Sequence, residues 1–454
     1  MAEQSNNRKL GNKATEWVSV KSFGATGDGV TDDSAAIQAA LDAHDHVYIP
    51  NGTYLVKDLS LNSFQILEFE SENAIFKGVI STDDVFSTTG SLARIRIFGG
   101  TIRDCGKGWY HTGNSALASC SIHRTVFRDC TYGNDLSTAV NCIWDNVQFG
   151  TNGGADNIDY GLYFRSDGSG QTNANHIREC VFFFFKEKGI TFEDSTISKG
   201  GNDISGCWFE DSTGIPIYVG GGTKQLNIHN TCYFETNGGT SKPDIKIEAV
   251  LAAINEIHID GNEFATPNTD QTERIECIGN AYFDARDNSV TLSTGDVFAT
   301  FAGAFGNHSK LFDNYLNATG AGSYESRLFT SSGSDLVSWS VSVGSGFVTE
   351  DTRPHSHLEG GESFAVYTLA NDATPSVEGM KLCKTGGTTT ITDFDDGRVG
   401  QTISILSEHA VTITDGAPII LNGSANFVMA AADTLTLTMF NDQIWQEVSR
   451  TVNL

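Results

Sequence analysis

Proline is scarce in this sequence, with 7 residues among 454, whereas glycine is abundant at 48. This combination argues against a disordered low-complexity chain and indicates a β-protein with many tight turns. Basic residues are also few: 29 Lys and Arg stand against 56 Asp and Glu, which gives a formal charge of −27. General nucleic-acid binders and anionic-membrane binders need a basic surface, so we expect neither partner.

Long apolar runs and paired cysteines are lacking too. No run approaches the roughly 18 residues of a membrane helix, and Met1–Leu10 lacks the charged-then-apolar order of a signal peptide. The nine cysteines form no CxxC pair, which excludes zinc sites of that kind. An odd number in a long chain does not suit a disulfide framework, so we expect buried free thiols, folding in a reducing compartment, and neither metal nor cofactor.

One short pattern recurs between residues 97 and 320. It begins with an apolar residue, usually Ile, continues through two turn-like residues, and ends in a short strand. The last residue of that strand, here called the anchor, returns about every 27 residues, within the range of solenoid repeats. Period-two alternation without helical periodicity predicts a parallel β-helix. The anchors are Ile102, Phe127, Phe149, Phe182, Phe209, Phe234, Phe264, Val290 and Leu316.

The position two residues before the anchor is filled by the same residue type in successive coils. It holds cysteine in three consecutive coils and asparagine in the next three: Cys180, Cys207, Cys232, Asn262, Asn288 and Asn314. Stacked coils place such side chains about 4.8 Å apart. We therefore predict a thiol column and an asparagine ladder that fill the interior or the turns of the solenoid.

The segment that precedes the repeats has a helix signature. Thr31 or Asp32 can cap a helix over residues 33–43, whose apolar face would cover the open first coil. Strands around the Asn51-Gly52 turn should follow it.

Residues 17–56 also carry a family likeness, in Phe23-Gly24-Ala25, in the run from Gly27 to Asp33, in the run from Ala36 to Ala40, and in Tyr48-Ile49-Pro50 with Gly52-Thr53-Tyr54. This stretch closely resembles the opening of the pectate-lyase-like superfamily of right-handed β-helix proteins. Members include pectin-acting lyases and hydrolases and many bacteriophage tailspikes. The motif is specific for the fold and says little about the reaction.

The C-terminal hundred residues differ from the repeats. The segments Ile419–Gly423, Thr434–Phe440 and Trp445–Val448 resemble small β-sandwich tail domains of phage spikes and fibres. In such relatives the domain assists trimerisation or carbohydrate binding. Together the two resemblances imply a tailspike depolymerase: a homotrimer of the virion tail, made in the bacterial host cytoplasm, that acts on a bacterial polysaccharide and docks to a phage tail or baseplate protein through its N-terminus.

We therefore expect an all-β chain with an N-terminal capping helix, a parallel β-helix and a C-terminal β-sandwich. The expected divisions are a short arm (1–16), the cap and start of the β-helix (17–58), the β-helix (59–335), a linker (336–358) and the β-sandwich (359–454).

Two glutamates are the leading candidates for catalysis. Hydrolysis of a glycosidic bond needs two carboxylates, one of them protonated. Residues on either side of an anchor share the outward face of its strand. Glu210 and Glu235 both directly follow an anchor, so they should lie on neighbouring strands, near the roughly 5 Å separation of a retaining pair. Their mutual repulsion would raise one pKa and leave an acid and a base.

Aromatic residues accompany this pair. Phe183, Trp208 and Tyr233 should lie beside the glutamates, with Glu263 next in the column of Tyr233, and we expect these four to contact sugar rings. The alternative is that the glutamates are solvated surface acids and that a neighbouring subunit covers the aromatic residues.

The longest coil, residues 150–176, provides a second candidate site. Long loops on a rigid scaffold commonly build binding clefts, and Asp156, Asp159 and Arg165 could form an acidic site there. The alternative is a polar Gly/Asn loop without a function of its own. A site shared between subunits also stays open.

Two other functions stay open. A lyase acting on uronic acids needs a base and a positive charge, which a bound Ca²⁺ could supply. The residues available for it are Arg165, Arg178, Lys224, His229, Tyr233 and Lys246, although they form no dense basic cluster. A spike that binds without turnover is the third alternative, because the fold does not fix the function.

Overall fold

The chain forms two compact units, Met1–Thr349 and Glu350–Leu454. The computed structural model describes residues 17–113, 115–150, 158–165, 171–196, 199–235, 237, 242–249, 256–265, 273–279, 284–293, 297–302, 309–319, 327–332, 337–343, 366–441 and 444–453. Among these residues, no helix has the length and apolar character needed to cross a membrane.

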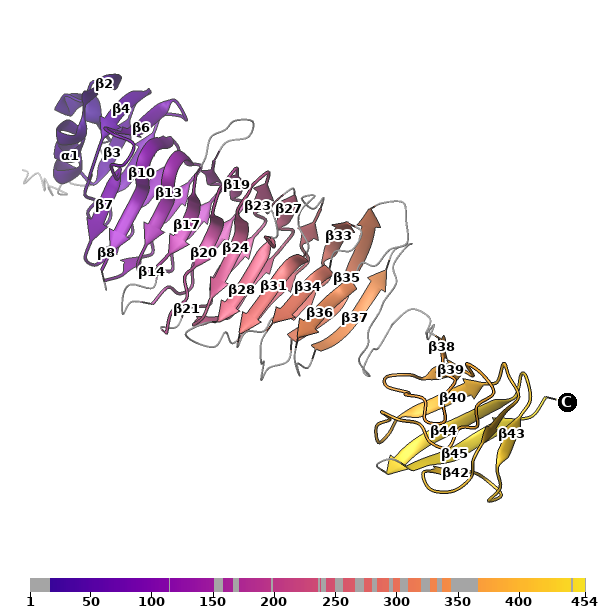
Figure 1. Ribbon diagram of the computed structural model, residues 1–454. Coiled ribbons are helices and arrows are strands. Elements are labelled where there is room, and N and C mark those ends of the chain that lie inside the picture. Colours follow the sequence, from indigo (N-terminus) through magenta and orange to yellow (C-terminus); the bar gives the residue numbers. More distant parts are fainter. Residues whose placement is uncertain are drawn as a thin grey trace, which may run out of the picture. The chain divides into compact units, whose positions relative to one another are not determined.

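The first unit begins with the expected helix. After β1 (Val18–Ser19), η1 (Val20–Phe23) and β2 (Asp28–Asp32), the helix α1 spans Ser34–Ala43 and buries Ile37, Ala40 and Leu41. Figure 1 shows α1 beside the first coils, at the N-terminal end of the stack of strands. The strands on either side of Asn51-Gly52 do not form a hairpin, because β3 pairs with β5 and β4 pairs with β6. In a solenoid each strand bonds to the next coil rather than to its neighbour in sequence.

The rest of the unit is a parallel β-helix, and the strands of its coils stack in three columns (Figure 1). The first column contains β3 (His46–Ile49), β5 (Ile66–Phe69), β9 (Arg96–Phe98), β12 (Ser121–His123), β15 (Ile143–Asp145), β18 (His176–Arg178), β22 (Asp203–Ser205), β26 (Leu226–His229), β29 (Ile257–Asp260) and β32 (Asp284–Arg286). The second contains β4 (Gly52–Val56), β6 (Ala74–Gly78), β10 (Thr101–Thr112), β13 (Val126–Leu136), β16 (Gln148–Phe149), β19 (Val181–Phe183), β23 (Trp208–Glu210), β27 (Tyr233–Glu235), β30 (Glu263–Phe264) and β33 (Ser289–Ser293).

The third column continues from the ends of β10 and β13, which turn the corner. It contains β7 (Phe86–Thr89), β17 (Tyr160–Phe164), β20 (Lys188–Phe192), β24 (Ile215–Gly220), β28 (Ile245–Ala249), β31 (Glu273–Gly279), β34 (Val297–Ala302) and β36 (Arg327–Ser332). The strand β35 (Ser309–Thr319) joins the first two columns and pairs with β37 (Val337–Val343). Short strands at other corners form two small sheets, β8 (Leu92–Ala93) with β11 (Leu117–Ala118) and β14 (Ala139–Val140), and β21 (Lys199–Gly200) with β25 (Thr223–Lys224).

The predicted anchors are confirmed as one column, and those from Ile102 to Val290 are buried in the interior. Ile102, Phe127, Phe149, Phe182, Phe209, Phe234, Phe264, Val290 and Leu316 are each in register with the next. From Phe127 to Phe264 the rings stack at centroid distances of 4.8 to 5.3 Å, nearly parallel. Each buried Phe side chain contributes about 1.5–3 kcal/mol through lost apolar exposure. This column therefore fixes the register of the coils.

A tight corner separates the first and second strands of most coils from β9 onward. Its first residue has a positive φ, as at Asn146, Glu179, Gly206 and Gly261, which lets two residues turn the chain from the first column to the second. The next residue points inward, and there the predicted thiol column and asparagine ladder are both found, fully buried.

The asparagine ladder satisfies buried backbone groups at this corner. Asn262 N donates to Asn288 Oδ1 at 2.9 Å, and Asn288 Nδ2 donates to the Ile259 carbonyl at 2.7 Å. The expectation of buried thiols is confirmed as well, because all nine cysteines are buried and none of them forms a disulfide.

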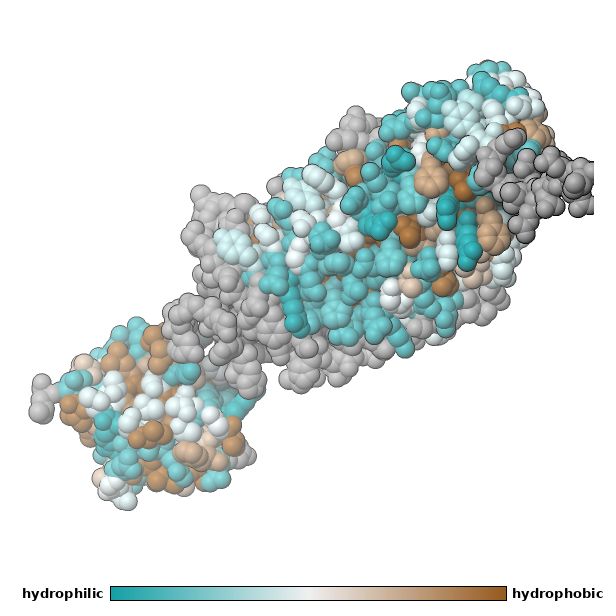
Figure 2. Space-filling model, turned by 180° about the vertical axis from the view of Figure 1, so that it is seen from behind, coloured by the Kyte–Doolittle hydropathy of each residue, from teal (hydrophilic) through white to brown (hydrophobic). Residues whose placement is uncertain are grey.

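The second unit, Glu350–Leu454, has a core of its own. A six-stranded sheet contains β38 (Val366–Thr368), β39 (Leu382–Lys384), β40 (Thr402–Leu406), β44 (Thr434–Asn441), β45 (Ile444–Thr451) and β42 (Ile419–Ile420), in that order. A two-stranded sheet contains β41 (Val411–Ile413) and β43 (Phe427–Met429), and both sheets contribute to one core around Trp445. On the face shown in Figure 2, hydrophobic residues are exposed over this unit, whereas hydrophilic ones dominate the described surface of the β-helix.

Candidate functional site

The outward side of the second column, here called the second-strand face, contains the predicted acid pair. Glu210 and Glu235 are in register on β23 and β27, and Phe183 precedes Glu210 in the same column. In the column on the other side of the anchors, Trp208 is in register with Tyr233, and Tyr233 with Glu263. The structure therefore brings these six residues together as the repeat alignment predicted. Backbones of neighbouring strands lie about 4.8 Å apart.

The two glutamates have different environments. The Tyr233 hydroxyl donates a hydrogen bond of 3.0 Å to Glu235 Oε2, and partial burial together with this bond raises the pKa of Tyr233 to about 12. Desolvation raises the pKa of Glu210, and the negative charges of Asp211 and Glu235 raise it further. The raised pKa makes Glu210 the candidate proton donor, and Glu235 is the partner that accepts the hydrogen bond of Tyr233.

An exposed aromatic surface adjoins the pair. Trp208 has 46% of its surface exposed, and its ring lies 4.7 Å from that of Tyr233 at an angle of 58°. Large exposed aromatic rings are uncommon on a soluble surface and are typical of binding sites.

Of the loop candidates, the two that the structure describes, Asp159 and Arg165, do not join this site. Asp156 lies outside the described residues. Asp159 accepts an ion pair of 3.3 Å from Lys186, and Arg165 forms a two-pronged contact with Asp135. The Asp135 side chain is fully buried and also lies 3.0 Å from Lys107 Nζ, so two cations offset the cost of burying this carboxylate. Arg165 thus neutralises a buried charge on another face.

The outward side of the third column, the third-strand face, carries a cluster that sequence reasoning missed. The Tyr163 hydroxyl donates to Glu193 at 2.9 Å, and the Tyr218 hydroxyl donates to Glu248 at 3.1 Å. Lys188 Nζ lies 3.5 Å above the Tyr218 ring, and burial lowers the pKa of this lysine although Glu248 and Glu193 oppose that effect.

The two carboxylates of this cluster lie on either side of one strand. Phe192 is in register with Val219 on β24, so Glu193, the next residue, lies opposite Gly220. Gly220 is in turn in register with Glu248 on β28. Two strand spacings make about 9.6 Å between the backbones, close to the 6.5–9.5 Å separation of an inverting carboxyl pair. A third-strand alignment, for instance of YGLYF at 160–164 with KGITF at 188–192, would have found this column.

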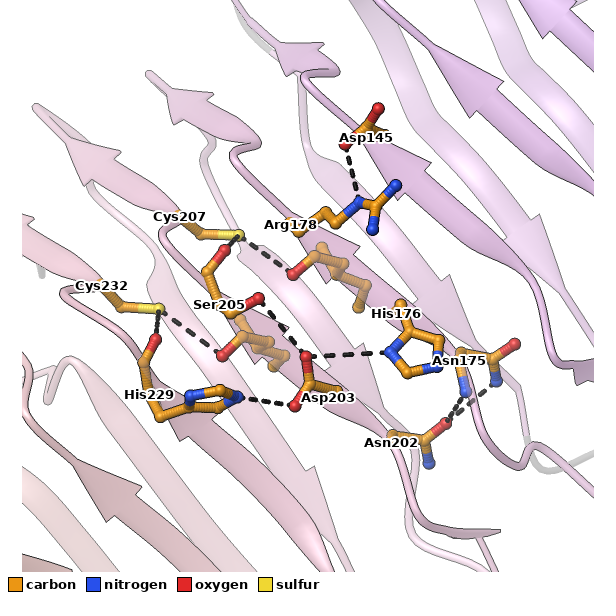
Figure 3. Close-up of polar contacts among 12 residues, drawn as sticks. Asp145, Asn175, His176, Arg178, Asn202, Asp203, Ser205, Cys207, His229 and Cys232 are labelled. Atoms are coloured by element: carbon orange, nitrogen blue, oxygen red, sulfur yellow. Dashed lines mark hydrogen bonds and ion pairs between the residues drawn. The ribbon is translucent and has the colours of Figure 1, made fainter.

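The outward side of the first column carries imidazole–carboxylate contacts (Figure 3). His229 Nε2 lies 2.7 Å from Asp203 Oδ1, and His176 Nδ1 lies 3.8 Å from the other oxygen of Asp203. Arg178 Nε donates to Asp145 at 2.8 Å.

The residues considered for a lyase are therefore spread over the β-helix. His229 and Arg178 lie on the first column, Tyr233 on the second, Arg165 directly after β17, Lys246 on the third column, and Lys224 in β25 at another corner. Among the described residues, no group of three or more His, Cys, Asp and Glu side chains is arranged to hold a metal ion.

Comparison with known proteins agrees with the architecture. Residues 17–240 match the family model described as rhamnogalacturonase A/epimerase, pectate lyase-like. This segment, just under half of the chain, is similar to the pectate-lyase-like β-helix proteins. The structure of the gp42 tailspike of Acinetobacter phage vb_AbaP_AS12 superposes with a TM-score of 0.52 at 12% identity, covering 98% of this chain and 83% of that one.

Two curated relatives share part of this chain. The preneck appendage protein of Bacillus phage PZA is 32% identical over 197 residues, which is 39% of this chain and 21% of the relative. Plasmin and fibronectin-binding protein A of Streptococcus pneumoniae (strain ATCC BAA-255 / R6) is 31% identical over 172 residues, covering 29% of this chain and 24% of the relative. The chain thus spans about a quarter of the length of the curated relatives it matches.

Proposed function

We propose that this protein is a phage tailspike that binds a bacterial surface polysaccharide and cleaves it by glycoside hydrolysis. The observation that carries the proposal is the in-register pair Glu210 and Glu235 beside the exposed Trp208, with the pKa of Glu210 raised by desolvation. In this proposal Glu210 protonates the leaving oxygen, and Glu235 attacks or stabilises the sugar, as expected for carboxyl groups on adjacent strands. Trp208, Tyr233, Phe183 and Glu263 contact the flanking sugars.

The phage relatives support the setting. A preneck appendage protein and a tailspike are virion tail components by their names, and we infer the same location here. A homotrimer, attached through its N-terminus to a tail or baseplate protein, is the assembly that we propose on the same grounds. The matched adhesin of Streptococcus pneumoniae supports the alternative of a spike that binds without cleaving.

The test measures polysaccharide products. The full-length protein is incubated with purified capsular and secreted bacterial polysaccharides, and viscosity, reducing ends and ultraviolet absorbance are followed. Hydrolysis gives falling viscosity and new reducing ends without absorbance, whereas unsaturated, absorbing ends identify a lyase. Binding without any product identifies a receptor-binding spike.

Variants then locate the chemistry. Glu210→Gln and Glu235→Gln should each lower turnover by a factor of at least 10², whereas Glu68→Gln, an exposed carboxylate on β5, should leave it unchanged. The third-strand pair is the second candidate, because the backbones of Glu193 and Glu248 lie two strand spacings apart, about 9.6 Å, close to the separation of an inverting carboxyl pair. Loss of turnover in Glu193→Gln and Glu248→Gln, with full activity in the first two variants, would move the active site to the third-strand face.

A further inference from the structure

Three basic residues lie at the N-terminal end of the column that carries the acid pair. Lys77, Arg103 and Arg128 are in register on β6, β10 and β13, directly after the anchor position of each strand. They occupy the outward position that Glu210 and Glu235 occupy further along the β-helix. The second-strand face is therefore cationic in its early coils and anionic in its later ones.

Hydrogen bonding within the protein leaves part of this basic segment unsatisfied. Like charges directly opposite one another on neighbouring strands are destabilising. Asp104 offsets part of that repulsion, at 3.3 Å from Lys77 Nζ and 3.6 Å from Arg103 Nε. The longer contact exceeds a hydrogen bond, and among the described residues the Nε atoms of Arg103 and Arg128 are buried without a hydrogen-bond partner. An anion bound at the partly exposed side chains of Arg103 and Arg128 would offset the repulsion between their charges.

The distance between the basic segment and the acid pair limits the ligand. Two coils separate Arg128 from Glu210, and in these coils the same outward position is occupied by Gly150 and Phe183. Gly150 contributes no side chain to the face. Three strand spacings make about 14 Å between the backbones of Arg128 and Glu210. A polymer lying along the β-helix axis contacts both ends of this face.

We propose that the substrate is an anionic polysaccharide whose acidic groups are separated by neutral sugars. The inference rests on the proposed function. One acidic substituent, a carboxylate or a phosphate, pairs with Arg103 and Arg128, since guanidinium groups bind both anions through paired hydrogen bonds. The sugar at Glu210, Glu235 and Glu263 is neutral, because an acid there would meet three carboxylates. A polymer with an acid on every residue fits this face poorly.

Binding to defined polysaccharides tests the proposal. The probes are a panel of purified bacterial capsular polysaccharides of known repeat, neutral, partly acidic and fully uronic, immobilised and titrated with the Glu210→Gln/Glu235→Gln protein. We expect binding to partly acidic members, weakened by salt. Reduction of the carboxyl groups to alcohols should abolish binding where the acid is a uronate and leave it intact where the acid is a phosphate. Arg103→Gln and Arg128→Gln should each weaken binding about tenfold or more.

A matched arginine provides the control. Arg178→Gln also removes an arginine that pairs with an aspartate, but on the first column, and should bind as the parent does. Thermal unfolding checks that each variant is folded. Binding confined to neutral or fully uronic members, no binding to any partly acidic member, or unchanged binding by both arginine variants each overturns the proposal.

The proposed hydrolysis is judged separately, from the reducing ends formed by the wild-type protein. Acid-dependent binding without products would reject hydrolysis and leave the inference on substrate class intact. Cleavage that is unaffected by substitution of Arg103 and Arg128 would support hydrolysis and reject the inference on substrate class.

Discussion

A column of glycines beside the phenylalanine ladder gives a sharp test of how the coils pack. Gly108, Gly133, Gly161 and Gly189 occupy equivalent positions at the start of the third column, and their φ angles are not in the left-handed region. Space, rather than conformation, therefore requires glycine here. A Cβ on Gly161 would lie 2.5 Å from the Gly189 carbonyl oxygen and 2.9 Å from the ring of Phe182.

The Gly161→Ala variant should therefore destabilise the β-helix. Both neighbours belong to rigid interior columns, and overpacking of such a core costs about 1–3 kcal/mol. With about 2–4 °C per kcal/mol for a domain of 150–250 residues, the unfolding temperature should fall by several degrees. The measurement is differential scanning calorimetry of the full chain at a fixed scan rate.

Gly200→Ala is the matched control for this test. Its added Cβ would come no closer than 3.4 Å to another atom, the Lys224 carbonyl oxygen, so little change is expected. The Phe182→Leu change in the Gly161→Ala background should show a coupling of about 0.5–3 kcal/mol, because it removes one of the two clashes. An unfolding temperature for Gly161→Ala equal to that of Gly200→Ala would refute the packing argument.

Three further variants probe buried polar groups. Burial lowers the pKa of Lys199 to about 8. Between pH 8 and 10.5 the unfolded chain still holds this proton and the folded chain does not, so the free energy of unfolding should rise with pH by up to about 3 kcal/mol. Lys199→Met should remove this rise in urea titrations. Asn288→Ala leaves the two donors of Asn262 without their acceptor, so a loss of several kcal/mol (about 1–3 per group) is expected in denaturant unfolding. The Arg450 ion pair lowers the pKa of Glu447, so the stability that it adds should be lost as pH falls below about 4.5, and Arg450→Gln should flatten that loss in unfolding scans from pH 6 to 3.

The sequence allowed the second column to be aligned residue by residue, because each coil carries the same short motif ending in an anchor, although the interval between anchors varies from 22 to 33 residues. That motif placed Glu210 opposite Glu235 and Trp208 opposite Tyr233. The third column could not be aligned in the same way. After Phe182 the third-column strand β20 begins at Lys188, whereas after Phe234 the strand β28 begins only at Ile245. Because the connecting loops differ in length, no fixed interval in the sequence relates the third-column strands.

The same cause explains a ladder that was missed. Asn175 and Asn202 precede the first strand of their coils and stack at 3.0 Å from Nδ2 to Oδ1, with Asn175 Oδ1 accepting from Cys142 N at 2.9 Å. Their corner follows segments of unequal length, so no interval in the sequence connects them. The asparagine ladder beginning at Asn262 follows a two-residue corner and could be predicted.

The separation of inward and outward residues has a consequence for function. Stability of the β-helix depends on columns such as Phe127 to Phe264, whereas Glu210, Glu235 and Arg128 point outward from the same strands. Alternation along a strand keeps the two sets on opposite sides of the sheet. Outward residues can therefore change without disturbing the core, and one fold can present acids, aromatic rings or cations at chosen coil positions. The chemistry of a β-helix is then determined by which outward columns are occupied and at what axial separation. For this reason the substrate class that we propose rests on the distance from the basic segment to the acid pair and not on the fold.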